Sequence, residues 1–445
     1  MKKGKSITLL SVLGVIMAVL IVLTLVRFPV GIKVYNSFVG AYDCDYDLAG
    51  GYAYTLTLSD SNEEEIVNKK DFLKTVSGRI EDLGYELYSV KGFENPDPSI
   101  TDYSVRIELK KDSKVAADIS AIAAYGKVRF FGGTSSSELS EILTDVNAVE
   151  KASYLGSTYY EGTTYQNFSV KFTADAKAEL DKAMSGASSY YLKAIVGEES
   201  GDFSTTVFDT SAGSSPFSIT NSYTNGTLSL SYGNDANQVK RMVMLLNKGG
   251  IDYKFTVDDG AEITSPYGNA TLGLIIALAV VLVGTVVFFC VKGKGFGLIA
   301  LLTILLILPI YAFMFIAIPG IVVNLGTLVG MLAGAILIAD GLFVFYKRLC
   351  EEYANGKTVK ASVKTAFKRS LMPTLSVGVV SAAVSILVFV LTKGVIKGFA
   401  IAFGIAAGAF LIASLLFLRM FVAIVLPLVK TENQDKFLNL KREDE

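Results

Sequence analysis

The chain has 445 residues, of which 51% are hydrophobic and 19% are charged, and its formal net charge is −1. Soluble domains carry about 25% charged residues, so this composition excludes an ordinary soluble globule. The near-zero charge gives no reason to expect nucleic acid as a partner. Histidine is absent, which excludes Ser-His-Asp and Cys-His triads and HExxH zinc sites. Three cysteines, Cys44, Cys290 and Cys350, predict no disulfide framework and no metal site. We therefore expect no catalytic residues, no bound metal and no cofactor, and a protein that is not an enzyme.

The first apolar run, Ile7–Val26, follows the basic residues Lys2, Lys3 and Lys5. It is long enough for a helix that crosses a membrane, which needs about 20 residues. A cleaved signal peptide is the alternative. Its apolar core would be shorter, and a small-x-small cleavage site would stand where Arg27-Phe28-Pro29 stands here. The sequence predicts a retained membrane helix at 7–27, after a cytoplasmic segment at 1–6.

Residues 28–270 are polar and alternate between strand-like and helix-like patterns. Tyr52–Leu58 is typical of a strand, and Glu63–Leu83 has a helical period. Further strands and helices flank a Ser/Gly/Thr-rich region at 186–226, which we expect to be loop. This order predicts an α+β, ferredoxin-like domain inserted between the first and second membrane helices. It shows no phosphate-binding loop and no paired catalytic carboxylates.

Five more apolar segments predict membrane helices within 271–429, followed by a cytoplasmic tail at 430–445. Breaks at Lys292-Gly293-Lys294 and Pro319-Gly320 make consecutive helices hairpins. Basic residues gather at the N-terminus, at Lys292 and Lys294, and between Lys347 and Arg369, whereas the short turn holding Lys393 and Lys397 is less basic. The positive-inside rule then places both termini in the cytoplasm and residues 28–270 outside. The predicted segments are Leu272–Val291, Phe296–Ile318, Val322–Phe345, Leu371–Leu391 and Phe399–Val429.

Two charges fall inside these predicted helices. Asp340 is the candidate functional acid, since a carboxylate within a membrane costs about 2.5–3.5 kcal/mol and is expected to face a bundle interior or a wet cavity. It would then be a protonatable relay group. Alternatively it lies near the cytoplasmic interface and pairs with Lys347 or Arg348. Arg419 either extends toward the cytoplasm or pairs with Asp340.

Small residues recur every four positions in two of the predicted helices, a spacing that lets helix backbones approach closely. Ser381 and Ser385 repeat this spacing in the fifth helix. At about 100° per residue, Asp340 falls within roughly 80° of Gly330, which places the acid on the packed half of its helix. The small-residue stripes are Gly326, Gly330 and Gly334, and Ala400, Gly404 and Gly408.

Four segments resemble motifs of one family. Asp47-Leu48-Ala49-Gly50-Gly51 resembles D-L-x-G-G, and the stretch from Asp340 to Arg348 resembles D-A-N-V-L-I-F-E-R. Lys397-Gly398-Phe399-Ala400, after Gly394, is similar to G-x-x-K-G-F-A, and Ala236–Ile251 is similar to the segment that closes the family's periplasmic domain. The chain thereby resembles the SecD subunit of the Sec protein translocase, in the resistance-nodulation-division superfamily. The resemblance is strong over 322–429 and weak over 52–235.

This resemblance implies one six-span half of a pseudo-symmetric twelve-span unit in the bacterial cell membrane, with a SecF-like subunit as the other half. It implies that a proton (or sodium) gradient drives movements of the outward domain that complete protein export and prevent backsliding. The implied partners are SecF, the SecYEG channel, unfolded preproteins and the lipid bilayer. Asp340 would be the proton-relay acid, Arg419 a candidate helper, and Gly398 with its neighbours a conformational joint.

The chain also departs from the family pattern. Leu342 stands where the family has asparagine, Ser376 where a second intramembrane acid is expected, and Gly326 where a proline is usual. Two other functions remain open: an exporter of lipid or small molecules from the same superfamily, and a multispan membrane receptor. A single outward domain with six spans favours the split Sec arrangement, because the exporters usually carry two such domains and twelve spans in one chain.

Overall fold

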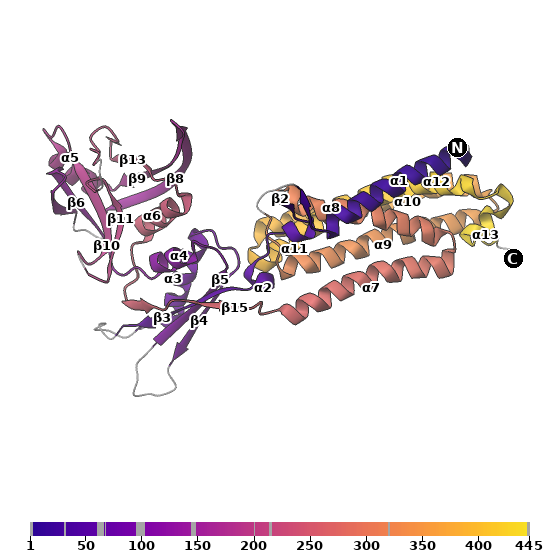
Figure 1. Cartoon of the computed structure of the whole chain (residues 1–445), viewed down its shortest axis with the longest axis horizontal. Helices are drawn as coiled ribbons and strands as arrows, with labels where there is room; N and C mark the ends of the chain where they lie inside the picture. Colours follow the sequence, from indigo (N-terminus) through magenta and orange to yellow (C-terminus); the bar gives the residue numbers. More distant parts are fainter. Residues whose placement is uncertain are drawn as a thin grey trace. The chain divides into compact units, whose positions relative to one another are not determined.

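The computed structural model describes residues 3–30, 33–59, 66, 68–94, 103–143, 148–199, 201–212, 216–318 and 321–442. The chain divides into two compact units (Figure 1). We call Met1–Ala49 with Ser265–Glu445 the helical unit, and Gly50–Thr264 the sheet unit. The predicted chain break at Pro319-Gly320, the basic residue Lys2 and the predicted helix start at Glu63 lie outside the described residues.

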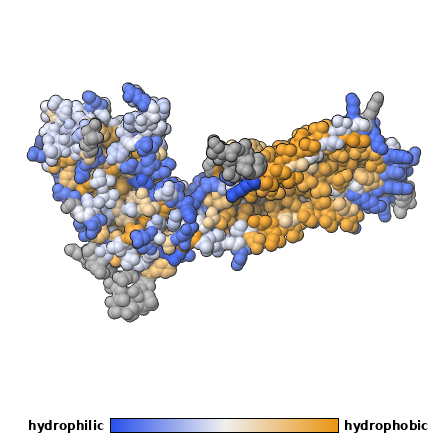
Figure 2. All heavy atoms as spheres, viewed as in Figure 1, coloured by the Kyte–Doolittle hydropathy of each residue, from blue (hydrophilic) through white to orange (hydrophobic). Residues whose placement is uncertain are grey.

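The helical unit contains six helices that are long and apolar enough to cross a membrane. Figure 2 shows the hydrophobic surface that covers them. Together with the sheet-rich region, they confirm the predicted fold class. The helices are α1 (Lys3–Leu25), α7 (Gly268–Gly293), α8 (Phe296–Ala317), α9 (Leu325–Ala354), α10 (Val359–Leu391) and a last span, Gly394–Leu428.

The last span is not one regular α-helix. It consists of α11 (Gly394–Leu411), a π-helical segment (Ile412–Phe417), α12 (Leu418–Val425) and a 3₁₀ turn (Leu426–Leu428). A further 3₁₀ turn (Thr431–Asn433) and α13 (Gln434–Leu438) follow. The backbone N–H of Gly295 donates to the carbonyl of Phe437 at 2.7 Å, which fixes α13 against the turn between α7 and α8.

Helices α9 and α10 extend well beyond the predicted apolar segments, into the region between Lys347 and Arg369 that we expected to be loop. Residues such as Glu, Lys and Ala favour helix even where they are polar, so the helices continue past the apolar stretch. Glu352 then becomes buried, and its carboxylate pairs with Lys357 and, at 2.5 Å, with Arg369 of α10. These ion pairs hold the α9–α10 hairpin together.

Helix α9 packs against α11, α10 and α7, and α1 packs against α8 and α12. Between α1 and α7 lie a small hairpin of β1 (Phe28–Val30) and β2 (Lys33–Tyr35), a 3₁₀ turn (Val39–Ala41) and the short helix α2 (Tyr46–Ala49). These short elements belong to the helical unit, whereas Gly50–Thr264 forms the sheet unit.

The first part of the sheet unit is a ferredoxin-like layer, in the order β-α-β-β-α-β along the chain. Its sheet has the strand order β14-β3-β5-β4, with β15 also paired to β3, and all of its pairings are antiparallel. Apolar side chains of α3 join those of β5 in one core. The elements are β3 (Gly51–Leu58), α3 (Lys69–Asp82), β4 (Ser89–Glu94), β5 (Tyr103–Lys110), α4 (Val115–Ile122), β14 (Phe255–Val257) and β15 (Ala261–Ile263).

A second part is inserted between α4 and β14 and contains two four-stranded sheets, β11-β10-β6-β7 and β12-β13-β9-β8. Its helices are α5 (Ala174–Met184) and α6 (Ala236–Lys248). The strands are β6 (Val128–Ser135), β7 (Glu138–Leu143), β8 (Val149–Tyr160), β9 (Thr163–Phe172), β10 (Tyr191–Gly197), β11 (Ser204–Asp209), β12 (Tyr223–Thr224) and β13 (Thr227–Tyr232).

The prediction of loop over 186–226 is wrong, because β10 and β11 lie there. Serine and threonine suggested loop, but threonine is β-branched and suits a strand. The apolar residues of Tyr191–Gly197 are mostly buried, as expected for a strand between two neighbours.

A buried arginine joins the two parts of the sheet unit. Arg79 of α3 is 1% exposed, and its guanidinium donates to the carbonyls of Ile122 at 3.3 Å and Gly249 at 2.9 Å. These carbonyls lie at the C-terminal ends of α4 and α6, where a cation is favourable. Burial lowers the pKa of Arg79 to about 10, and it remains charged at neutral pH.

Candidate functional site

The candidate site is built around helix α9, and its N-terminal end is fixed by a capping box. The side chain of Asn324 accepts a hydrogen bond from the Thr327 N–H at 3.0 Å. In return, the Thr327 hydroxyl accepts one from the Asn324 N–H at 3.2 Å. Two backbone donors that the helix itself cannot satisfy are thereby paired. This local pattern sets the start of α9 at Leu325.

Asp47, from the D-L-x-G-G-like motif, also binds this helix start. It is 1% exposed, and its Oδ2 accepts a hydrogen bond from the Leu325 N–H at 2.7 Å. A carboxylate at a helix N-terminus is stabilising by about 0.3–1 kcal/mol. The buried Oδ1 has no hydrogen-bond partner among the described residues. Burial raises the pKa of Asp47 above its ordinary value, and the Leu325 N–H acts in the opposite direction.

Backbone hydrogen bonds tie the same segment to the chain before α9. Val323 forms a parallel bridge with Cys44, in which the Val323 N–H donates to Asp43 at 2.7 Å and Asp45 donates to Val323 at 2.9 Å. The Ser265 hydroxyl donates to the Asp47 carbonyl at 2.5 Å. The motif segment is therefore connected both to α9 and to the residues that precede α7.

The second motif, around Gly398, lies at the same place. A Cβ on Gly398 would lie 2.2 Å from Oδ1 of Asn324, and a Cβ on Gly326 would lie 1.8 Å from the carbonyl oxygen of Val395. Only glycine allows the start of α11 to approach the start of α9 this closely. Two motifs about 350 residues apart in the sequence thus meet at one helix end, a contact that their spacing could not reveal.

The other motif residues have local roles. Gly50 has a φ of 78°, which favours glycine, and the buried Gly51 begins β3. The Phe399 ring stacks on Phe403 with centroids 5.6 Å apart, and the ammonium of Lys397 lies 5.2 Å from the centroid of the Phe389 ring.

Glycines continue the contact between α9 and α11. A Cβ on Gly330 would lie 2.7 Å from Cβ of Ala402, and one on Gly334 would lie 2.3 Å from Cβ of Ala406. Further along, Gly341 faces Ser414 in the same way at 2.1 Å. We call this contact of α9 with the last span the glycine seam; its members on α9 are Gly326, Gly330, Gly334 and Gly341.

The stripe on the last span faces α10 at Ala400 and Gly404, and it faces outward at Gly408. Ala400 is fully buried, and its carbonyl accepts a hydrogen bond from the Ser385 hydroxyl of α10 at 2.6 Å. Gly404 contacts the same serine, since a Cβ there would lie 2.3 Å from Oγ. Gly408 differs from the prediction, because it is exposed and has nothing within 4 Å of its Cβ position.

Asp340 does not lie on the packed half of α9 in the structure of this chain, so that prediction is wrong. Its side chain is exposed, although it immediately precedes Gly341 of the seam. Each residue turns the helix by about 100°, which directs Asp340 away from α11. It shares an exposed, otherwise apolar stripe of α9, which we call the open face: Val329 (40% exposed), Ile336 (53%), Asp340 and Phe343 (37%).

Of the two alternatives for Arg419, the structure does not contain the ion pair with Asp340. Arg419 is exposed on α12, and its guanidinium lies 6.0 Å from the centroid of the Phe367 ring on α10. Arg348 pairs with Glu351 at 2.7 Å instead. Within the described part of the chain, no lysine or arginine forms an ion pair with Asp340. Among the residues that the structure describes, the acid is therefore unpaired.

The π-helical segment Ile412–Phe417 had no signal in the sequence. It packs beside α9, and its Ser414 contacts the seam at Gly341. The Ser414 hydroxyl is buried without a hydrogen-bond partner among the described residues. Short π segments in α-helices occur often at functional sites.

Comparisons with known proteins agree with this architecture, although no family model matches the chain. Over 164 residues the chain is 30% identical to the protein translocase subunit SecD of Acidaminococcus fermentans, covering 36% of this chain and 38% of that protein. Over 179 residues it is 25% identical to SecD of Streptomyces coelicolor, covering 39% of this chain and 31% of that protein. The matches therefore span well under half the length of these relatives.

The fold is similar over nearly the whole chain to that of a solved SecDF structure in its super-membrane-facing form. The TM-score is 0.64 at 14% identity, and the match covers 96% of this chain and 58% of the other. The fold thus defines a membrane protein with a SecDF-like helical part and a sheet-rich domain. With the SecD similarity in sequence, these findings support a divergent SecD-like protein.

Proposed function

We propose that this chain is an accessory subunit of the Sec preprotein translocase in a bacterial cell membrane. It uses the proton (or sodium) gradient to drive movements of the sheet unit that complete export and prevent backsliding at a SecYEG channel. Two similarities support this role: the SecD relatives are translocase subunits, and the SecDF chain has the same fold. The chain covers 58% of that SecDF chain, which leaves room for a second, SecF-like subunit.

The observation that carries the proposal is an unpaired carboxylate on the open face of a helix of membrane-spanning length. Asp340 lies fifteen residues after Leu325, which is about 22 Å along the helix. The hydrocarbon core of a membrane is about 30 Å thick, so this depth is within it. Exposing the charge to lipid would cost about 2.5–3.5 kcal/mol. A second six-span subunit that covers the open face removes this cost and supplies a route for the ion.

The geometry at the other end of α9 supports coupling to the outward side. The helix start is hydrogen-bonded to Asp47 and packed on Gly398. Asp47 lies four residues before Gly51, where β3 and the sheet unit begin. A shift of α9 that follows protonation of Asp340 would therefore act directly on the segment that leads into the sheet unit.

The orientation follows from charge. The positive-inside rule places the basic turn between α9 and α10 in the cytoplasm, together with both termini. The sheet unit then lies outside, where an exported chain emerges. Arg419, held over the Phe367 ring, is proposed as a structural group and not as a partner of the acid.

The test is export in cells that depend on this chain as their SecD. We expect Asp340→Asn to insert and fold normally, and to lose the part of export that depends on the gradient. Asp340→Glu, the matched control that keeps a titratable carboxyl, should retain much of it. Full gradient-dependent export by the Asn variant would exclude the relay role.

A second measurement addresses the partners. The full chain, purified in mild detergent, should bring with it a six-span SecF-like protein and SecYEG. A homo-oligomer with bound lipid would instead favour an exporter of the same superfamily.

A further inference from the structure

Strand β8 forms one edge of the sheet β12-β13-β9-β8 and, among the described strands, pairs only with β9. The half of this edge before the bulge at Tyr154–Gly156, which we call the inner half, is covered at Ala152 by Asn247 of α6. Its side-chain amide donates to the carbonyl of Ala152 at 2.9 Å and accepts from the N–H of the same residue at 2.7 Å. A side chain thus takes the place of the peptide group that a next strand would present.

The remaining part of the edge, residues 156–160, is open: it has no neighbouring strand besides β9 in the described chain, and we call it the outer half. Ser157 lies opposite Gln166, and the Gln166 N–H donates to Gly233 at 3.1 Å, on the side away from β8. Ser157 and Gln166 therefore form a non-hydrogen-bonded pair, and the N–H and carbonyl of Ser157 point outward. The direction of the backbone groups alternates along a strand, so the N–H and carbonyl of Tyr159, two residues after Ser157, also point outward. Within the described chain, no other strand reaches these groups.

The sequence of this edge is unusual for an unprotected strand. Sheet edges are generally blocked by charges, proline or a short length. Residues 152–160, ASYLGSTYY, contain no charge and no proline. A bulge between Tyr154 and Gly156 separates the covered half from the open half. Large apolar side chains are exposed around the open half: Leu155 (59%), Tyr159 (73%), Tyr160 (63%) and Tyr165 on β9 (39%).

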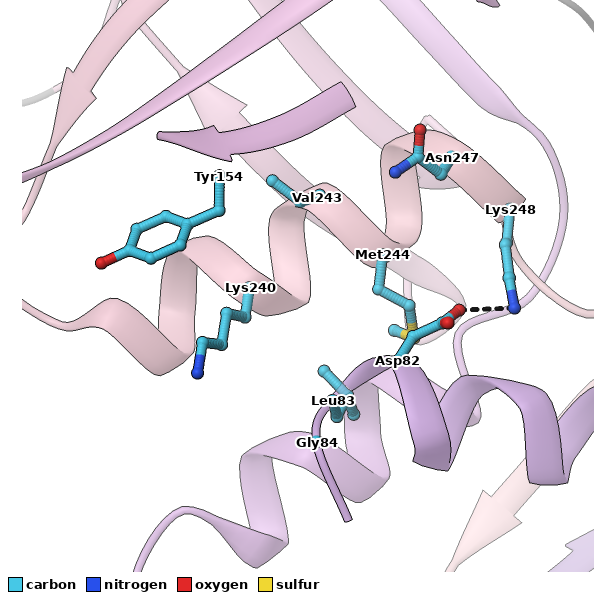
Figure 3. Close-up of a pocket in the computed structure, with 9 residues that line it drawn as sticks. All are labelled: Asp82, Leu83, Gly84, Tyr154, Lys240, Val243, Met244, Asn247 and Lys248. Atoms are coloured by element: carbon cyan, nitrogen blue, oxygen red, sulfur yellow. Dashed lines mark ion pairs between the residues drawn. The ribbon is translucent and has the colours of Figure 1, made fainter. Parts of the chain in front are cut away.

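A pocket adjoins the point where the covered half ends. It has a volume of about 390 Å³ and lies between the end of α3, β8 and α6 (Figure 3). Tyr154 of β8 lines it together with Leu83, Val243 and Met244, and Lys248 pairs with Asp82 at its rim. An extended chain on the open half of β8 could place one apolar side chain here.

We propose that the outer half of β8 is a docking strand for an extended, uncharged segment of another polypeptide. That segment adds to the sheet edge through main-chain hydrogen bonds, which give affinity without requiring one sequence. The exposed tyrosines contact its side chains, and the pocket receives one of them. The identity of the ligand as an unfolded exported chain rests on the proposed function, whereas the surface itself does not.

A second copy of this chain fits the edge less well than an unfolded segment. The open stretch comprises about five residues, and pairing of two such edges would bury far less than the roughly 1,200–2,000 Å² of a stable interface. An extended segment needs only this short edge and the adjacent pocket.

The test measures binding of the full-length protein in detergent to reduced and carboxymethylated α-lactalbumin, a permanently unfolded protein. Ser157→Pro removes one outward N–H and places a ring at the edge, but it breaks no hydrogen bond between β8 and β9. We expect about tenfold weaker binding. Ser157→Ala, the matched control that keeps the backbone N–H, should bind like the unaltered protein. The double variant Tyr159→Ser with Tyr160→Ser should also weaken binding of the probe, and it leaves the backbone groups of β8 unchanged.

A photo-crosslinking residue in place of Tyr159 should attach to the unfolded probe. Unchanged binding by both the Ser157→Pro and the double tyrosine variants would overturn the proposal. Crosslinks that join two copies of this chain, or attachment to lipid vesicles instead of the probe, would overturn it as well. If binding behaves as expected but export is unaffected by the same variants, the docking strand stands but its ligand is not the exported chain; failure of the proposed function itself would appear in the Asp340→Asn test.

Discussion

Helix α9 has two contrasting faces. The glycine seam packs closely against the last span, whereas the open face is exposed. On the glycine seam, the Cβ of a side chain at Gly330 or Gly334 would lie 2.3–2.7 Å from atoms of α11. On the open face, Ile336 and Phe343 are exposed beside an unpaired Asp340. The seam is formed within this chain, whereas a carboxylate on the open face would cost about 2.5–3.5 kcal/mol if it faced lipid.

The largest expected effect on stability comes from a substitution in the glycine seam. Gly334→Leu would force a side chain against Ala406 of α11, because even a Cβ at Gly334 would lie 2.3 Å from the Cβ of Ala406. Overpacking typically costs about 1–3 kcal/mol, and a contact this short should exceed that range. We expect little monodisperse protein in detergent and a strongly lowered unfolding midpoint. Gly408→Leu is the matched control, because nothing lies within 4 Å of that position. Equal midpoints for the two variants would contradict the seam.

Much of the fold could be predicted from the sequence because it depends on local patterns. Six apolar runs of membrane-spanning length and the β-α-β-β-α-β order are such patterns. Helix ends were less predictable: α9 and α10 continue through polar residues that favour helix, and the ion pairs of Glu352 that then hold the hairpin form only in the folded chain. Strand β10 was missed because the region was judged by its serines and threonines, although Tyr191–Gly197 is largely apolar and is buried between β11 and β6.

The site was predictable only in its parts. Spacing identified the glycines, but it could not show that Asp47 and Gly398 meet at the start of α9. The position of Asp340 was misjudged because angular proximity to Gly330 does not define a face when the true contact line runs through Gly334 and Gly341. A π segment depends on hydrogen bonding between backbone groups and leaves no mark in the sequence.

The open face is tested by a bulky apolar side chain, which lipid tolerates and a packed subunit does not. We expect Ile336→Trp to fold normally and to lose most of the copurifying six-span partner, because the added ring separates the two subunits. Val280→Trp, at a position on α7 that is 63% exposed, is the control and should keep the partner. Retention of the partner by both variants would mean that the open face faces lipid.

A smaller effect on stability is expected at the N-terminal end of α9. Asp47→Ala leaves the Leu325 N–H without an acceptor and should cost about 1–3 kcal/mol of unfolding free energy. Asp47→Asn keeps an acceptor and should cost less. Burial raises the pKa of Asp47 in the folded state above its ordinary 3.8. The folded protein then binds the proton more tightly than the unfolded chain, so stability falls as pH rises through that window.

The pH dependence can be measured directly with the Asn variant as the reference, because its side chain does not titrate. As the pH is lowered from neutral toward 4, the unaltered protein should gain stability relative to Asp47→Asn. Thermal unfolding of both proteins in detergent across this range provides the measurement. A relative loss of stability at low pH would show that the hydrogen bond from Leu325 outweighs burial at this carboxylate.

The smallest effect on stability is expected at Arg419. Its substitution also tests whether Arg419 acts together with Asp340 or only Asp340 is functional. Its guanidinium lies 6.0 Å from the Phe367 ring, an exposed cation–π contact worth about 0.5–1 kcal/mol. Arg419→Lys keeps a cation that can reach the ring, so stability should change by less than this amount. Gradient-dependent export should be unchanged, since the structure gives Arg419 no contact with Asp340. If Arg419→Lys abolished export while the protein stayed folded, the arginine would have to act through the partner subunit, and the open face would then extend from α9 to α12.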